Sequence, residues 1–171
     1  MNKNLVLTGM MGVGKSTIGR LVAKRLKVKF VDIDKIIEKK ERKSIKRIFE
    51  DRGEEYFRVL ERKITLKILK NKKAVIALGG GAFMNNQIRE KILKSCISVW
   101  LKVDLDKLIK RYKKNTRRPL LNQKKLDTNV KKIYQARKKI YSLANFKVNC
   151  DNMSKTQVVE KVLFYYENQS T

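Results

Sequence analysis

Short apolar runs alternate along the chain with longer stretches in which apolar residues recur at helical spacing. The apolar runs predict strands near residues 3–8, 28–31, 74–78, 97–101 and 146–149. The helical spacing predicts helices near residues 16–27, 35–41, 44–52, 54–70, 86–94, 104–113, 129–142 and from Ser154 onward. Strands separated by helices are typical of an α/β fold with a parallel sheet, helices on both faces, and ligands at the carboxyl ends of the strands.

The length of the chain favours one folding unit. Its 171 residues, 42% of them hydrophobic, suffice for one buried core and are too few for two ordinary domains, so we expect a single domain over residues 1–171. No apolar run is long enough to cross a membrane, which predicts a cytoplasmic protein with no membrane partner. We also expect a monomer. Cys96 and Cys150 lie in apolar segments without metal-binding spacing, which predicts two buried thiols.

The composition is strongly basic. The chain has 43 Lys and Arg against 16 Asp and Glu, a formal charge of +27, which would suit a nucleic-acid partner. However, the basic residues are spread over nearly every expected helix, and core packing explains the helical spacing of Tyr112, Tyr134, Tyr141, Phe164 and Tyr165. We therefore expect no specific nucleic-acid binding, and a surface that attracts anionic substrates. Because the chain has no histidine, proton transfer falls to Asp, Glu or a less usual group.

The most informative motif follows the first expected strand. Gly9-Met10-Met11-Gly12-Val13-Gly14-Lys15-Ser16 has the spacing of a P-loop, and a helix is expected directly after it. In such a loop the backbone N–H groups surround the phosphates, the Lys15 ammonium reaches the β and γ phosphates, and the Ser16 hydroxyl can bind Mg²⁺. The positive end of the helix faces the same anion. The motif predicts that the chain handles a nucleoside triphosphate.

Two further segments lie at the ends of expected strands. Asp32 and Asp34 follow the second strand, where one carboxylate can face Mg²⁺ and the other a substrate hydroxyl; alternatively, Asp34 caps the next helix. Gly79-Gly80-Gly81 follows the strand near 74–78 and indicates that the backbone comes close to a ligand or to another chain segment. We favour a ligand, with a tight strand-to-helix turn as the alternative explanation of the three glycines.

Several arginines are candidates for binding anions. Taken singly, Arg58, Arg111 and Arg137 look like surface arginines. Arg118 differs because it lies beside Pro119 in a polar stretch near residues 114–126, which we predict to be a mobile lid that brings positive charge onto the transferred phosphoryl group.

Taken together, these motifs resemble those of the shikimate kinase family. The resemblance rests on the P-loop, Asp32 and Asp34, Phe57-Arg58, Gly79-Gly80-Gly81, Arg118-Pro119-Leu120 and the spacing of Arg137 from Tyr141. It extends over nearly the whole chain. It implies a fold similar to that of nucleoside monophosphate kinases, a three-layer α/β/α arrangement whose five-stranded parallel sheet has the order 2-3-1-4-5. It also implies transfer of the γ-phosphoryl group of ATP to the 3-hydroxyl of shikimate, on the route to chorismate.

The resemblance further implies a role for each matching residue. ATP would be bound by Gly12, Val13, Gly14, Lys15, Ser16, Thr17, Arg111 and Arg118, with Asn149 to Ser154 beside the adenine. Shikimate would be bound by Asp34, Arg58, Gly80, Gly81 and Arg137, with Arg58 and Arg137 sharing its carboxylate. Mg²⁺ would be bound by Ser16, with Asp32 acting near it through water. Lys15, Asp34 and Arg118 would be catalytic, and the chain departs from the family at Lys139, where a proline is common.

Two other functions fit part of the sequence. A different small P-loop kinase, acting on a sugar acid such as gluconate or on a nucleoside monophosphate, would share the phosphate-binding loop. A nucleic-acid-binding ATPase would account for the charge and would show hydrolysis stimulated by polynucleotides. A catalytically inactive regulatory protein is disfavoured because every polar group expected of the kinase is present.

Overall fold

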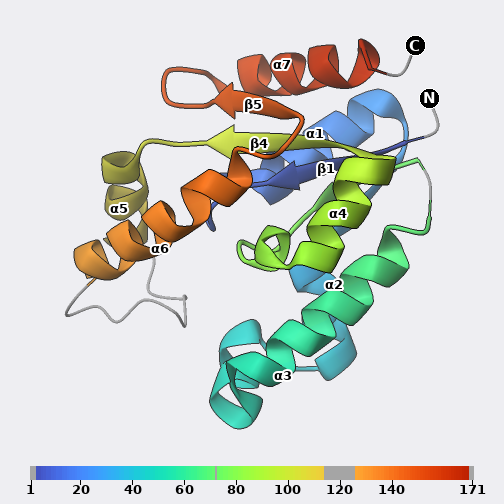
Figure 1. The fold of residues 1–171 in the computed structure, drawn as a ribbon. Helices are drawn as coiled ribbons and strands as arrows, with labels where there is room; N and C mark the ends of the chain where they lie inside the picture. Colours follow the sequence, from blue (N-terminus) through green and yellow to red (C-terminus); the bar gives the residue numbers. More distant parts are fainter. Residues whose placement is uncertain (1–2, 72, 114–125, 170–171) are drawn as a thin grey trace.

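The computed structural model describes residues 3–71, 73–113 and 126–169, and its central element is a parallel β-sheet (Figure 1). The strands are β1 (Asn4–Thr8), β2 (Lys29–Asp32), β3 (Ala74–Ala77), β4 (Cys96–Lys102) and β5 (Phe146–Asn149). They lie side by side in the order β2-β3-β1-β4-β5, and every neighbouring pair is parallel. This confirms the strand order that the family resemblance implies.

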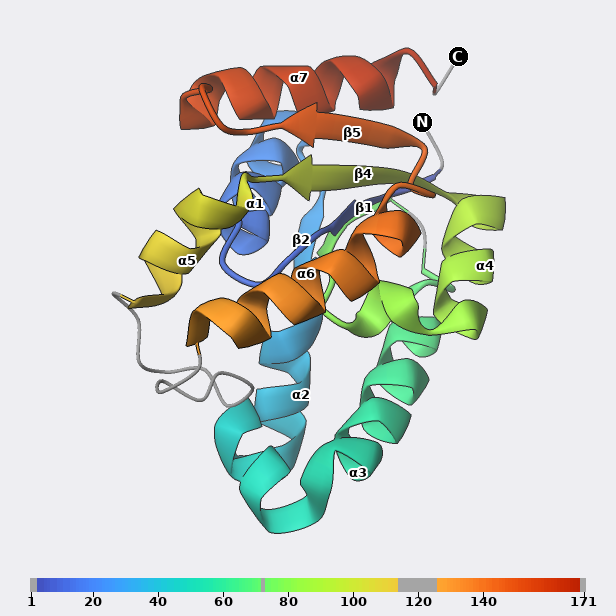
Figure 2. The ribbon, with the colours of Figure 1, turned by 60° about the vertical axis from the view of Figure 1, so that its left-hand side comes forward.

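Helices cover both faces of the sheet. They are α1 (Lys15–Leu26), α2 (Ile33–Glu41), α3 (Ile45–Ile68), α4 (Asn86–Ser95), α5 (Leu105–Lys113), α6 (Leu126–Tyr141) and α7 (Lys155–Glu167), with a short 3₁₀ helix, η1 (Ala82–Met84). Helices α1 and α7 pack together on one face, and α4 lies on the other (Figure 2). Helices α2 and α3 extend away from the sheet as a pair beyond β2 (Figure 2).

The core follows from the apolar runs in the central strands. Leu5, Val6 and Leu7 of β1 are fully buried, because β1 has a strand on each side and helices on each face. The edge strands β2 and β5 are less buried. Cys96, at the start of β4, is buried as expected. The expectation for Cys150 was wrong: it is partly exposed, because it lies just past the end of an edge strand.

The helix ends follow local sequence signals. The Ser44 side chain accepts a hydrogen bond from the N–H of Arg47 and begins α3, and Ser154 forms a capping box with Gln157 at the start of α7. Helix α3 is interrupted at Gly53, whose φ of 79° and ψ of 173° are not helical. The two helices expected on either side of Gly53 are therefore the two arms of a kinked α3.

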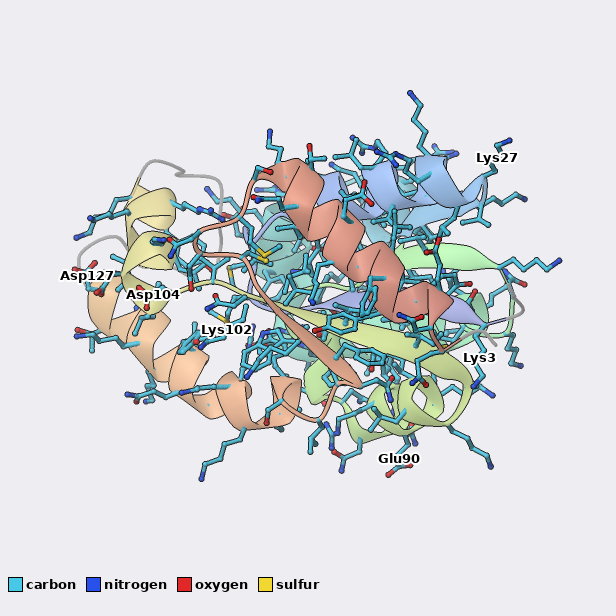
Figure 3. The ribbon with its side chains drawn as sticks, turned by 90° about the horizontal axis from the view of Figure 1, so that it is seen from above. Lys3, Lys27, Glu90, Lys102, Asp104 and Asp127 are labelled. Carbon is cyan, nitrogen blue, oxygen red and sulfur yellow. The ribbon has the colours of Figure 1, made fainter. Side chains whose placement is uncertain are left out.

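The outer surface carries the excess of basic side chains. They extend from the periphery on several sides, as Lys3 and Lys27 do at separate places in Figure 3. Phe164 was expected in the core but is 55% exposed, on α7, with the Lys161 ammonium 5.2 Å from its ring. None of the helices in the described residues combines the length and apolarity needed to cross a bilayer.

Candidate active site

The carboxyl ends of β1, β2 and β3 open into one cavity of about 970 Å³. Four parts of the chain meet there: the P-loop with the first turn of α1, the start of α2, the middle of α3, and the glycine segment after β3. Helix α6 adds Arg137. The cavity lies where the sheet topology predicts a ligand site.

The P-loop wraps around the ammonium group of Lys15. Its Nζ atom donates hydrogen bonds to the carbonyl oxygens of Gly9 and Met10, both at 2.9 Å. Gly14, with φ of 103°, precedes the first residue of α1, a conformation that glycine adopts without steric cost. The Lys15 side chain is thus held at the helix N-terminus, where phosphate binds in this class of loop.

The expected nucleotide-binding residues lie around this loop. Gly12, Gly14, Lys15, Ser16 and Thr17 line the cavity, and the Val13 side chain is buried. Arg111 was expected beside the adenine and Arg118 in a lid that closes onto the phosphates. Arg111 is on α5, with Nη1 3.4 Å from the carbonyl oxygen of Gly12, whereas Arg118 lies outside the described residues.

Helix α5 is fixed to the P-loop by a second contact. The Tyr112 hydroxyl donates a hydrogen bond to the carbonyl oxygen of Met11 at 2.5 Å, and Tyr112 is buried. At the start of the same helix, the N–H of Asp104 donates to Oδ1 of Asp151, and the Lys107 ammonium donates to the Asp151 carbonyl oxygen. These bonds place α5 between the P-loop and the segment expected beside the adenine.

Asp32 and Asp34 line the cavity from the start of α2. The structure reverses the capping alternative: Asp32 is the N-cap, and its Oδ1 accepts a hydrogen bond from the N–H of Lys35 at 3.3 Å. Asp34 lies in the first turn of the helix, because α2 begins at Ile33. The capping role therefore falls on the carboxylate expected near the metal, and Asp34 remains available to a substrate.

The protonation of Asp34 is set by its surroundings. Burial raises the pKa of Asp34 to about 6, and the nearby Lys15 ammonium limits this rise. The carboxylates of Glu61 and Asp32 raise the pKa further by repulsion. A carboxylate with a pKa near 6 can accept a proton at neutral pH more readily than an exposed aspartate.

The donor atoms at the mouth of the P-loop suit Mg²⁺. Ser16 and Asp32 offer a hydroxyl and a carboxylate oxygen to the same cavity, and Mg²⁺ prefers oxygen ligands. Among the described residues no cluster of three or more His, Cys, Asp or Glu could hold a metal alone. In nucleotide sites Mg²⁺ is usually bound by one or two protein oxygens together with phosphate oxygens and water.

Arg58 lies on the opposite wall of the cavity, in an ion-pair cluster on α3. Its Nη1 atom donates to Oε2 of Glu61 at 2.7 Å, and its Nε and Nη2 atoms donate to Oε1 of Glu54 at 3.1 and 2.9 Å. Glu61 is buried, whereas the Glu54 side chain is 55% exposed. Burial raises the pKa of Glu61, and the Arg58 guanidinium opposes this rise. Arg58 is therefore a cation held in a defined position, whereas the arginine-rich composition of the chain suggested an ordinary surface residue.

Arg137 reaches the same wall from α6. Its Nη1 atom donates to the carbonyl oxygen of Gly80 at 3.0 Å, and the Tyr141 hydroxyl donates to the same oxygen. The structure thus brings Arg58, Arg137, Gly80 and Gly81 together, as the family resemblance implied, and places them in one cavity with Asp34.

The glycine segment is explained by the side chains packed against it. A Cβ atom at Gly79 would lie 2.5 Å from Oε1 of Glu61 and 2.6 Å from Oδ1 of Asp34. A Cβ atom at Gly81 would lie 2.5 Å from Nη1 of Arg58. The close approach inferred from the three glycines is therefore real, and much of it is to the polar side chains of the cavity.

Sequence reasoning missed several cavity residues. Glu61 and Phe49 were not singled out, and Met11 and Phe57 were noted only as parts of motifs. The rings of Phe49 and Phe57 have centroids 4.7 Å apart and form an apolar wall. Glu61 could have been found from its spacing, because it lies one helical turn after Arg58, whereas the aromatic wall needs the fold of α3.

Comparison with known proteins identifies the family. A model of the shikimate kinase family matches residues 11–166. The chain belongs to the shikimate kinase family. Among its relatives, the shikimate kinase of Sulfurihydrogenibium sp. strain YO3AOP1 is 44% identical over 161 residues, 94% of this chain and 96% of that protein. The shikimate kinase of Persephonella marina is 39% identical, over 94% of this chain and 97% of that protein.

Solved structures of shikimate kinases have the same fold. The enzyme from Acinetobacter baumannii in complex with shikimate superposes with a TM-score of 0.92 and 29% identity, covering 98% of this chain and 94% of that one. The shikimate kinase from Aquifex aeolicus has a TM-score of 0.86 and 33% identity, with 98% of each chain covered.

Proposed function

We propose that this chain is an ATP-dependent kinase that phosphorylates the 3-hydroxyl of shikimate, giving shikimate 3-phosphate and ADP. The product lies on the route to chorismate and the aromatic amino acids. The observation that carries the proposal is that one cavity is lined by a phosphate-binding loop, by two arginines, Arg58 and Arg137, and by Asp34. Asp34 interacts electrostatically with Lys15 on the phosphate side and with Glu61, the partner of Arg58, on the other side.

The two arginines suit an acid substrate. Guanidinium groups bind carboxylates through paired hydrogen bonds of defined geometry, so Arg58 and Arg137 would fix one end of shikimate. Gly80 and Gly81 line the cavity beside them, and the Phe49 and Phe57 rings offer an apolar surface to the carbon ring. Anchored in this way, a hydroxyl on the substrate ring can face Asp34.

The reaction is then positioning and charge neutralisation. Asp34 orients the 3-hydroxyl and accepts its proton, while the Lys15 ammonium stabilises the charge of the γ-phosphoryl group. Ser16 and Asp32 would hold Mg²⁺, which neutralises charge on the phosphate oxygens when it is bound. The lid near residues 114–126 and Arg118 within it stay predictions, as does the role of Arg111 beside the adenine.

A coupled assay of ADP release with ATP, Mg²⁺ and shikimate tests the proposal. Gluconate, nucleoside monophosphates and a polynucleotide serve as the alternative acceptors or activators. Shikimate methyl ester, which keeps the hydroxyl but lacks the anionic carboxylate, tests the two arginines, and we expect its KM to be about 100-fold higher. Failure to turn over shikimate, or faster turnover of gluconate, would contradict the proposal.

The proposal includes a cytoplasmic monomer without a nucleic-acid or membrane partner. The spread of basic side chains over several sides of the molecule supports the part of the proposal that concerns nucleic acid. Light scattering of the purified protein tests the monomer. Hydrolysis of ATP stimulated by a polynucleotide, with steep salt dependence, would contradict the expected absence of a nucleic-acid partner.

A further inference from the structure

Tyr141 is a buried residue that contacts Gly80, a residue of the cavity wall, without lining the cavity itself. It is the last residue of α6, its side chain is fully buried, and it is not among the residues that line the cavity. Its hydroxyl donates a hydrogen bond to the carbonyl oxygen of Gly80. Arg137, one helical turn earlier, donates to the same oxygen at 3.0 Å. A single carbonyl group thus attaches the end of α6 to the glycine segment.

This attachment bears on both arginines. Arg137 is bonded directly to the Gly80 carbonyl, and the neighbouring Gly81 lies so close to the Arg58 guanidinium that a methyl group on Gly81 would displace it. The distance between the two guanidinium groups therefore depends on where the glycine segment lies relative to α6. Without the tyrosine hydroxyl, Arg137 would be left as the side chain from α6 that holds this segment.

The surroundings of Tyr141 hold its hydroxyl in place. Its ring stacks on Trp100 of β4, with centroids 5.9 Å apart, and its hydroxyl lies 4.0 Å from Sδ of Met10 in the P-loop. Burial raises the pKa of Tyr141 to about 12, so the hydroxyl keeps its proton and remains a donor. Packing in the core thus holds the Tyr141 ring in place, and the hydroxyl on this ring holds the Gly80 carbonyl through its hydrogen bond.

We propose that Tyr141 is a positioning residue for substrate binding, which holds the Gly80 carbonyl so that Arg137 and Arg58 are correctly spaced for one carboxylate. The inference rests on the proposed function, because it takes that carboxylate to be the one on shikimate. Tyr141 does not line the cavity, so it would act on substrate binding through the glycine segment.

The test replaces the hydroxyl alone. Tyr141→Phe keeps the ring and its stacking on Trp100 and removes one hydrogen bond. We expect the shikimate KM to rise about 3- to 10-fold, as loss of one hydrogen bond predicts, with kcat and the ATP KM within about 2-fold of the unmodified enzyme. A rise in both KM values together, or a fall in kcat alone, would overturn the proposal.

Tyr166→Phe is the matched control. It removes the hydroxyl of another buried tyrosine, which donates to the carbonyl oxygen of Lys3 at 2.7 Å, at the opposite end of the sheet from the cavity. Its shikimate KM should be unchanged. If Tyr166→Phe raises the shikimate KM as much as Tyr141→Phe does, the effect is one of general stability and the proposal fails.

A second variant restores the donor. Replacing Tyr141 with 4-aminophenylalanine keeps an N–H at the position of the hydroxyl, and the shikimate KM should return to within about 2-fold of its normal value. Continued weakness would overturn the inference. Absence of shikimate turnover in the unmodified chain overturns the proposed function and this inference with it, whereas normal turnover with an unchanged KM in Tyr141→Phe overturns this inference alone.

Discussion

The Nη1 atom of Arg58 lies 2.7 Å from Oε2 of Glu61, and the two side chains differ sharply in exposure. The Glu61 side chain is 3% exposed and the Arg58 side chain 29%. The buried glutamate therefore holds one side of the guanidinium, while Arg58 lines the cavity. A buried carboxylate of this kind restricts the guanidinium to one direction.

Arg58→Lys is expected to weaken shikimate binding selectively. Lysine keeps the charge but loses the planar fork that can bond Glu61 and a substrate carboxylate together, so the shikimate KM should rise about 10- to 100-fold. The ATP KM should change less than about 3-fold. Arg52→Lys, an exposed arginine on the same helix that stacks on Tyr56, serves as the control in the steady-state assay. Equal changes in both KM values would argue for a different acceptor.

Gly81→Ala should impair the same function without unfolding the protein. The added Cβ would lie 2.5 Å from Nη1 of Arg58, and its nearest neighbours are all atoms of that guanidinium, so the end of this side chain must shift while the backbone stays in place. We expect a shikimate KM at least about 10-fold higher and a melting temperature within about 2 °C of the unmodified protein. A normal KM would show that Arg58 does not need its present position.

Asp34→Asn should separate catalysis from stability. Loss of the proton acceptor should lower kcat by about 10²- to 10⁴-fold while ATP still binds. Removal of a buried carboxylate with a raised pKa should also increase the melting temperature at pH 7 by about 3–8 °C. Glu90→Gln, on α4 outside the cavity, is the control for loss of one negative charge. A kcat near normal would remove Asp34 from the mechanism.

The pH dependence of both properties follows from the same group. Because the pKa of Asp34 is raised to about 6, kcat/KM should increase with pH through about 6 and then level off. The contribution of Asp34 to the free energy of unfolding changes in the opposite direction, because it decreases as pH rises. The folded state binds this proton more tightly than the unfolded chain, so the contribution of Asp34 is full below about pH 4 and is lost as pH rises through about 6. The difference in melting temperature between Asp34→Asn and the unmodified protein should therefore vanish near pH 4.

Lys15→Ala should affect the nucleotide side of the cavity. The Lys15 ammonium bonds two carbonyl oxygens of the P-loop at the N-terminus of α1, where phosphate is expected to bind. Its removal should lower kcat/KM for ATP by at least about 100-fold. Lys24→Ala, an exposed lysine on the same helix, should leave turnover unchanged. Normal activity in Lys15→Ala would contradict the assignment of the P-loop.

Much of the fold was predictable because its signals are local. The apolar runs of β1, β3 and β4 identify buried strands, and Ser44 and Ser154 mark helix starts through their own hydrogen bonds. The strand order came from the family resemblance, since periodicity does not state which strands are neighbours. The thiol of Cys150 was misplaced because exposure at an edge strand depends on that order.

The site was predictable where a motif names its residues. Lys15, Asp34 and Arg58 occupy the cavity as expected. The carboxylates bonded to Arg58 lie one turn away on the same helix, but the charges of Lys15 and Glu61 that act on Asp34 come from distant parts of the chain. The position of Asp34 near Glu61 and the bond of Tyr141 to Gly80 arise from contacts between segments far apart in the chain, which no local spacing encodes. The same reason hid the aromatic wall.

The Glu54–Arg58 pair means that the acid-binding wall already holds an anion before any substrate arrives. All three guanidinium nitrogens of Arg58 are bonded, two of them to the half-exposed Glu54. Binding of an acid substrate is therefore an exchange in which the Glu54 carboxylate moves into solvent and the substrate carboxylate bonds Arg58 in its place. The Arg58 guanidinium stays paired with a carboxylate throughout this exchange. A neutral molecule of similar shape has no charge with which to replace the Glu54 carboxylate, so it competes poorly for the site.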